Sequence, residues 1–144
     1  MDWRARASMT FVLHERLAAD CVEVCDLEIC KVLLMNDARY PWLILVPRRD
    51  GLTDLHQISQ DEQAQVFAEI TQASEVLETL YSPHKLNVAA LGNQVPQLHI
   101  HVIARQTDDK AWPGPVWGVG ESVPYEAAML AHAGEQLRAT FSQG

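Results

Sequence analysis

The chain has 144 residues, 48% of them apolar, which suffices for one buried core without disulfides or metals. Its formal net charge of −8 argues against broad nucleic-acid binding, which needs a basic surface to replace counterions. The longest apolar run, residues 42–46, is too short to cross a membrane, and the first residues lack a signal peptide's hydrophobic stretch, so a cytoplasmic protein without membrane contact is expected.

The N-terminal part of the chain predicts a tail followed by a short helix. Residues 1–9 show no hydrophobic periodicity and are interpreted as a tail, in which Met9 is an alternative start. Residues 10–144 are expected to form a single domain. Residues 11–20 are expected to be helical because Phe11, His14 and Leu17 are spaced to share one face.

Two apolar runs and a long amphipathic segment come next. Residues 32–35 and 42–46 predict two neighbouring buried strands around a turn-rich segment. Ser59 and Glu62 have the spacing of a capping box, which predicts the start of a long helix. Its expected buried positions recur every three or four residues until Ser82-Pro83 stops the pattern; they are Val66, Phe67, Ile70, Ala73, Leu77 and Leu80.

The last third of the chain predicts two more strands and a closing helix. Residues 85–91 and 98–104 are expected to be strands joined by residues 92–96. Residues 112–118 hold too many prolines and glycines for regular structure. Residues 124–141 show a weak helical pattern through Leu130, Ala133, Leu137 and Phe141.

Two histidines lie two positions apart in the last predicted strand. Because alternate residues share a strand face, Gln97, His99 and His101 are expected to project together, opposite an apolar face. From spacing alone, the histidines are either ordinary half-exposed strand residues, catalytic groups or two ligands of a metal ion. A metal site needs a further ligand, and His14, His56, His84 and the three cysteines lie in separate segments without ligand spacing.

Residues 97–103, QLHIHVI, resemble the histidine triad (HIT) motif, His-φ-His-φ-His-φ-φ, with Gln97 in the place of the first histidine. The likeness extends over residues 28–118. Residues 87–117 look especially like a bacterial branch labelled as dinucleoside polyphosphate hydrolases. The resemblance implies an α+β fold of HIT type, with a mostly antiparallel sheet of about five strands, one long packed helix and a homodimeric assembly.

The resemblance also implies a two-step nucleotidyl transfer. His99 matches the family's nucleophile, which attacks the α-phosphorus of a nucleotide, forms a nucleotidyl-histidine and then yields to water. His101 matches the last histidine, which contacts the phosphoryl oxygens or the leaving group. The implied substrate is a dinucleoside polyphosphate or an adenosine phosphoramidate. No metal is required, although a divalent ion accompanying a polyphosphate would not be surprising.

Substrate-binding positions carry over from the same resemblance. Asn36 matches a position that holds ribose hydroxyls, and Asn87 one that lines the phosphate side of the pocket. Gly92, Asn93 and Gln94 are expected to offer donors to the phosphate. For the two asparagines, a turn or strand-end residue that bonds its own backbone is the alternative.

Two positions depart from the family pattern. Gln97 replaces the first histidine, and Trp42 stands where a fourth histidine usually sits, so two titratable groups near the nucleophile are lost. Trp112 and Trp117 match a region that often reaches the partner's site in a dimer. For all three tryptophans, packing in the core or under the tail is the alternative reading.

Four arginines lie close to the predicted site in sequence, and two other functions are compatible with its histidines. Arg39, Arg48, Arg49 and Arg105 lie at predicted strand ends, where they either attract polyphosphate or are solvated surface charges. A nucleotide-binding module with little turnover is the first rival function. A metal-dependent hydrolase that uses His99 and His101 as ligands is the second.

Overall fold

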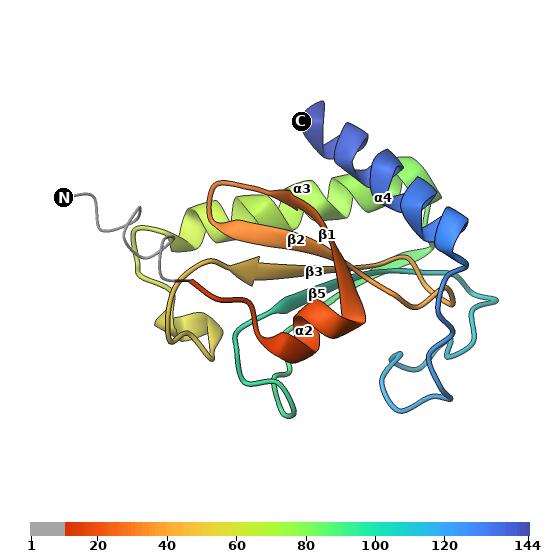
Figure 1. The fold of residues 1–144 in the computed structure, drawn as a ribbon, viewed down its shortest axis with the longest axis horizontal. Coiled ribbons are helices and arrows are strands. Elements are labelled where there is room, and N and C mark those ends of the chain that lie inside the picture. The colour runs from red at the N-terminus through yellow and green to blue at the C-terminus, as the bar shows by residue number, and fades with distance from the viewer. Residues whose placement is uncertain (1–10) are drawn as a thin grey trace.

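The computed structural model describes residues 11–144, in which five strands form one sheet in the order β1-β2-β3-β5-β4 (Figure 1). The predicted tail, residues 1–9, lies outside the described residues. The strands are β1 (Cys21–Asp26), β2 (Cys30–Met35), β3 (Trp42–Pro47), β4 (Lys85–Ala89) and β5 (Ile100–Arg105). Every neighbouring pair is antiparallel. The predicted α+β architecture, with an antiparallel sheet of about five strands and a long helix, is confirmed.

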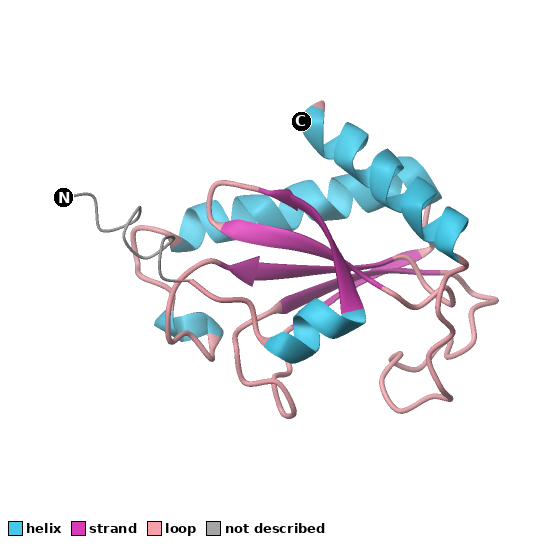
Figure 2. Cartoon of the chain, in the orientation of Figure 1, coloured by secondary structure: helices cyan, strands magenta, loops and turns pink. Residues whose placement is uncertain are grey.

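Helices cover the sheet unequally. α3 (Gln63–Tyr81) and α4 (Ala127–Ser142) lie on one side of it, whereas the short α2 (Glu15–Asp20) and the long loops lie on the other (Figure 1). A 3-10 turn, η1 (Leu55–Gln57), precedes α3. The segment between β5 and α4 has neither helix nor strand, as its prolines and glycines predicted (Figure 2). Within residues 11–144, no helix is both long and apolar enough to cross a membrane.

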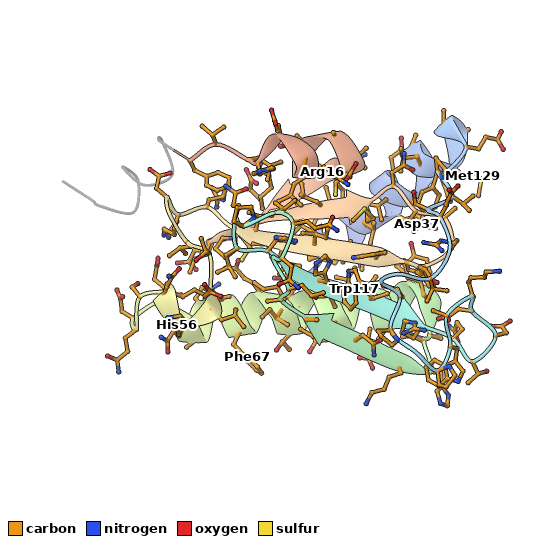
Figure 3. The ribbon with its side chains drawn as sticks, turned by 90° about the horizontal axis from the view of Figure 1, so that it is seen from below. Arg16, Asp37, His56, Phe67, Trp117 and Met129 are labelled. Carbon is orange, nitrogen blue, oxygen red and sulfur yellow. The ribbon has the colours of Figure 1, made fainter. Side chains whose placement is uncertain are left out.

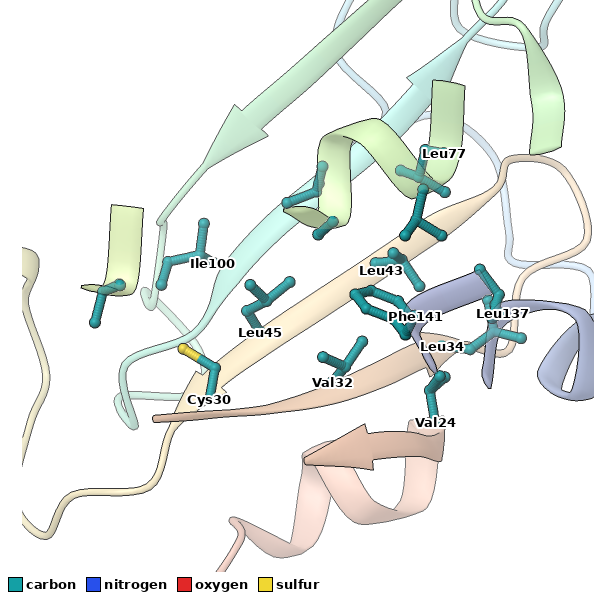
Figure 4. Packing of buried hydrophobic residues seen from close by; sticks show 14 of the residues in the cluster. Val24, Cys30, Val32, Leu34, Leu43, Leu45, Leu77, Ile100, Leu137 and Phe141 are labelled. Carbon is teal, nitrogen blue, oxygen red and sulfur yellow. The ribbon is translucent and has the colours of Figure 1, made fainter. Parts of the chain in front are cut away.

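The central strands are buried on both faces, which explains why their sequences are almost continuously apolar. Leu34, Leu45 and Ile100 face α3 and α4 and pack with Leu77 and Phe141 (Figure 4). The opposite face holds a smaller cluster that includes Leu33, Ile44 and Ile103. Each large aliphatic side chain buried in this way contributes about 1.5–3 kcal/mol to folding. The second cluster forms the floor beneath the loops and α2.

Helix α3 follows the predicted periodicity with one exception. Val66, Ala73 and Leu77 are buried, as expected. The prediction for Phe67 was wrong, because 70% of its surface is exposed. The buried stripe instead includes Glu69, whose carboxylate accepts hydrogen bonds from the backbone N–H groups of residues 29 and 30. A buried carboxylate is stabilised by such donors, so a charged residue occupies a core position.

The predicted capping box was also wrong. Helix α3 begins at Gln63, and no side chain caps its first turn. Ser59 Oγ donates to Asp61 Oδ1 at 2.9 Å, and Glu62 is 97% buried in an ion pair with Arg49, whose Nε lies 3.0 Å from Glu62 Oε1. Glu62 is engaged by Arg49 rather than by the start of the helix, because a buried carboxylate needs a cationic partner.

The N-terminal helix is shorter than predicted. It begins at Glu15, and His14 caps it by accepting a hydrogen bond from the Arg16 N–H at Nδ1, at 3.0 Å. Phe11 therefore precedes the helix rather than sharing a face with Leu17, which is the buried residue of α2. No strand was predicted at β1, which pairs with β2 through a register irregularity between Glu23 and Cys25.

Candidate functional site

A cavity of about 690 Å³ opens on the face of the sheet that carries α2 and the loops, and its size suits a small-molecule ligand. It brings together most of the predicted site: Asn36, Trp42, residues 92–94, His99, His101 and Trp117. Figure 3 looks onto this face, with Trp117 over the sheet, Arg16 on α2 and Asp37 at the far end. Gly92 has a φ of 77°, a left-handed conformation that favours glycine in this loop.

The two histidines lie side by side at the floor of the cavity. Their ring centroids are 4.8 Å apart, and both side chains are more than nine-tenths buried. His101 lies in β5 opposite Ile44 of β3, whereas His99 immediately precedes the strand, which begins at Ile100. The predicted juxtaposition of the histidines is therefore observed, although the strand starts two residues later than expected.

A hydrogen bond fixes the tautomer of His99. Its Nδ1 lies 2.7 Å from the backbone oxygen of Gln97. Because a carbonyl oxygen can only accept, Nδ1 must carry a proton and donate it. In the neutral ring, Nε2 then holds the free lone pair that a nucleophile requires.

The side chain of Gln97 turns away from the histidines. Its Oε1 accepts from the His14 N–H at 2.8 Å, and its Nε2 donates to the Val12 oxygen at 2.9 Å. The prediction that Gln97 projects with His99 and His101 from one strand face was wrong, because the strand begins only at Ile100. The amide fastens the segment that leads into α2, and α2 forms one wall of the cavity.

Trp42 contacts His101 directly. The indole Nε1–H donates to His101 Nδ1 at 3.0 Å, and the two side chains are almost completely buried. Trp117 packs edge-on against His101, with ring centroids 5.0 Å apart. Burial, together with the neighbouring His99, lowers the pKa of His101 from 6.5 to about 3. His101 is therefore neutral near pH 7 and, with Nδ1 accepting from Trp42, carries its proton on Nε2.

The turn after β2 forms one end of the cavity. Asn36 Oδ1 accepts from the Tyr125 N–H at 2.9 Å, which leaves the amide nitrogen as its remaining donor. Asp37, which directly follows Asn36 and was not predicted as a site residue, also lines the cavity. Burial raises the pKa of Asp37, but hydrogen bonds from Arg39 outweigh this effect and lower it overall. Arg39 is thereby held in an ion pair, at 2.8 Å, rather than left solvated.

Besides Gln97, two predicted site residues, Asn87 and Trp112, lie outside the cavity. Asn87 Oδ1 accepts from Arg105 Nη1 at 2.8 Å, and Trp112 packs edge-on against His84. Arg105 is 1% exposed, and its guanidinium lies 2.7 Å from Asp109 and over the ring of Trp112. These residues form a buried polar network next to the site, so Arg105 is not a surface charge.

A second cavity of about 320 Å³ also reaches His99 and is lined by residues 53–56 and 90–92. His56 and His99 both line it. Within residues 11–144, no three histidine, cysteine, aspartate or glutamate side chains gather as metal ligands. The alternative of a metal held by His99 and His101 therefore lacks a third protein ligand among the described residues.

The sequence matches a known domain family, and the structure resembles solved structures of histidine triad proteins. Residues 16–108 match the model of the HIT domain family. A histidine triad protein from Marinobacter aquaeolei is 45% identical, with a TM-score of 0.89 over 92% of this chain and 97% of that one. One from Bradyrhizobium japonicum is 44% identical, with a TM-score of 0.88 over 91% of this chain and 98% of that one.

More distant structures share the fold alone. A zinc-bound histidine triad family protein from Mycobacterium smegmatis is 16% identical, with a TM-score of 0.65 over 94% of this chain and 96% of that one. No curated protein matches the sequence significantly.

Proposed function

Because the chain belongs to the HIT domain family, in which the middle histidine of the motif is the nucleophile, we propose that His99 attacks the α-phosphorus of a nucleotide and that the protein hydrolyses nucleotide phosphate bonds. The observation that carries this proposal is the hydrogen bond from His99 Nδ1 to the Gln97 oxygen. In the neutral ring this leaves the lone pair of Nε2 free beside a neutral donor, His101, in a cavity large enough for a nucleotide.

The reaction proceeds in two displacements. In the first, His99 Nε2 forms a bond to the α-phosphorus, and the bond to the leaving group breaks with its electron pair. The Gln97 oxygen stabilises the positive charge that the substituted imidazole then carries, because it accepts from Nδ1. In the second, water attacks the phosphorus, releases the nucleoside monophosphate and returns His99 to its starting form.

Neutral donors complete the proposed phosphate site. His101 Nε2–H and the backbone N–H groups of residues 92–94 contact the phosphoryl oxygens, where negative charge grows in the transition state. The Asn36 amide nitrogen donates to the ribose hydroxyls. A dinucleoside polyphosphate or an adenosine phosphoramidate would supply the nucleotide, and a divalent ion would enter only with a polyphosphate.

A labelling experiment tests the proposal. The protein is incubated with an adenosine polyphosphate labelled at the α-phosphate, quenched in base and digested. We expect acid-labile label on the peptide that contains His99, because phosphoramidate bonds to histidine survive base and break in acid. Binding without label or product would instead favour a nucleotide-binding module, and activity lost to a chelator and restored by zinc would favour a metal-dependent enzyme.

We also propose that two copies associate through the edge of β4. Among residues 11–144, this strand pairs with β5 on one side and with no strand on the other, so its outer edge has unpaired backbone groups that can pair with another strand. Val88 in β4 and Leu91 just after it are 48% and 43% exposed. Phe67 projects from α3 near the same edge (Figure 3). These apolar side chains support a partner at this edge rather than solvent.

The substitution Val88→Arg should convert the proposed dimer to a monomer, because it would place a charged side chain from each copy in an apolar interface at the strand edge. Light scattering coupled to size exclusion measures the mass directly. Met129→Arg is the matched control, since Met129 is also exposed (57%) but lies on α4. A wild-type protein that is monomeric at all concentrations would contradict this proposal without affecting the proposed chemistry.

A further inference from the structure

Trp42 determines which nitrogen of His101 carries a proton. An indole N–H donates and never accepts, so the 3.0 Å contact from Trp42 Nε1 requires a lone pair on His101 Nδ1. The geometry is fixed by the sheet, in which Trp42 pairs with Ile103 and Ile44 with His101. A neutral His101 held in this way always presents Nε2–H, because Nδ1 is already committed.

His101 therefore lacks the second, acidic proton of an imidazolium at neutral pH. Burial and the neighbouring His99 lower its pKa to about 3, and a proton added at Nδ1 would point at the indole N–H. Loss of the remaining Nε2 proton would create an imidazolate anion in a buried site, which is strongly disfavoured. His101 can stabilise negative charge as a donor, but it cannot act as a general acid.

No other titratable group that lines the cavity is placed to act as the general acid. The other groups on its lining are Arg16, Asp20, Asp37, Arg39 and His99. Asp20 is ion-paired with Arg16 at 3.1 Å, and Asp37 with Arg39 at 2.8 Å, so both carboxylates are held as acceptors. The Nδ1 proton of His99 is donated to the Gln97 oxygen. Among the described residues, the lining lacks a proton donor for a basic leaving group.

We propose that Trp42 is a positioning residue that locks His101 as a permanent neutral donor, and that the site therefore selects substrates whose leaving group departs as a stable anion. This inference rests on the proposed nucleotidyl transfer to His99. Its substrate class is the phosphoric anhydrides, such as dinucleoside polyphosphates, rather than phosphoramidates of basic amines.

The two substrate classes differ in where the electron pair of the breaking bond goes in the first step. With an anhydride, the phosphorus–oxygen bond breaks as the bond to His99 Nε2 forms, and the electron pair stays on a phosphate oxygen that needs no proton. The Nε2–H of His101 stabilises that oxygen by a hydrogen bond. With an alkyl amidate, the electron pair would remain on nitrogen, which must be protonated to leave as an amine.

Three substrates that share an adenosine α-phosphate test the proposal. They are a diadenosine polyphosphate, the p-nitrophenyl ester and an N-alkyl amidate of adenosine monophosphate, and the rate of the first step is measured for each. We expect the amidate to react at least about 10²-fold more slowly than the other two, because general acid catalysis is worth about 10²–10⁴-fold. Trp42→His should narrow this gap most at low pH, since a second imidazole can then hold a titratable proton beside His101. Trp117→Phe, which alters a contact to His101 without removing its hydrogen bond, should preserve the gap.

Nitrogen NMR of the ¹⁵N-histidine-labelled protein supplies a readout that does not depend on turnover. In the wild type, His101 Nδ1 should be unprotonated and its signal constant between about pH 5 and 8, where an ordinary histidine titrates. In Trp42→Phe, protons should distribute over both nitrogens. Protonated Nδ1 in the wild type would overturn the lock.

The rate comparison distinguishes failure of the proposed selectivity from failure of the proposed function. Equal rates on all three substrates, with label on His99, would overturn the selectivity and leave the proposed function standing. No label from any substrate would contradict both.

Discussion

His99→Gly should abolish covalent labelling and lower kcat/KM by about 10⁴-fold or more, because the variant removes the attacking nitrogen from the proposed reaction. The cavity and its donors remain, so nucleotide binding should change much less than turnover. Covalent labelling followed by mass spectrometry of the digest, together with equilibrium binding of the nucleotide, measures the two effects separately.

Added imidazole sharpens this test. The glycine variant has space where the ring of His99 lay, and free imidazole should enter it and restore part of the rate in a concentration-dependent manner. His132→Gly is the matched control, since His132 is exposed on α4 away from the cavity. If His99→Gly still accumulates acid-labile label on another side chain, His99 is not the nucleophile.

Arg105→Leu should lower the free energy of unfolding by about 3–5 kcal/mol, which is the cost of leaving a buried ion without its partner. Arg105 is 1% exposed, and Asp109 and Asn87 accept from its guanidinium. The variant leaves the carboxylate of Asp109 buried without its cation. Urea denaturation followed by tryptophan fluorescence measures the change.

An exposed pair with the same spacing is the control for Arg105. Arg16 and Asp20 are also four residues apart, but their side chains are 61% and 47% exposed. Arg16→Leu should therefore cost at most about 1 kcal/mol. Similar losses in the two variants would contradict the role assigned to burial.

The effect of Arg105 should also depend on pH. Hydrogen bonds from Arg105 lower the pKa of Asp109 below its ordinary value of 3.8. A carboxyl group whose pKa is lower in the folded state stabilises the protein above its unfolded pKa and loses that contribution as pH falls through the folded pKa. The stability difference between wild type and Arg105→Leu should thus be largest near neutral pH and shrink below about pH 3.8.

Much of the fold could be predicted because its central elements are periodic and buried. Strands β2 and β3 carry nearly continuous apolar runs, and helix α3 carries a helical apolar period with few exceptions, so local sequence determines their type. Strand β1 was not predicted because it is an edge strand with an irregular register, and its apolar residues come in pairs that match neither period. The prediction of a capping box was wrong for a different reason. Glu62 binds Arg49, thirteen residues earlier, and no local sequence pattern reveals such a partner.

The candidate site was predicted in outline because His99 and His101 are close in sequence. What sequence could not provide are hydrogen bonds between distant segments. Gln97 binds the backbone at His14, and Trp42 binds His101 across two strands, so the roles of both departures depend on tertiary contacts. Asn87 was predicted to line the pocket, but a hydrogen bond from the distant Arg105 holds its side chain outside the cavity.

The bonds between Gln97 and residues 12–14 bear on how the protein should be handled. Residues 12 and 14 are hydrogen-bonded to the side chain of Gln97, and the backbone oxygen of Gln97 orients His99. A fusion tag at the N-terminus would be attached close to this segment in sequence. A displacement of residues 12–14 would act on Gln97, whose backbone oxygen holds the ring of His99. Affinity handles for kinetic work belong after α4, whose last turn is separated from the cavity by the whole thickness of the sheet (Figure 1).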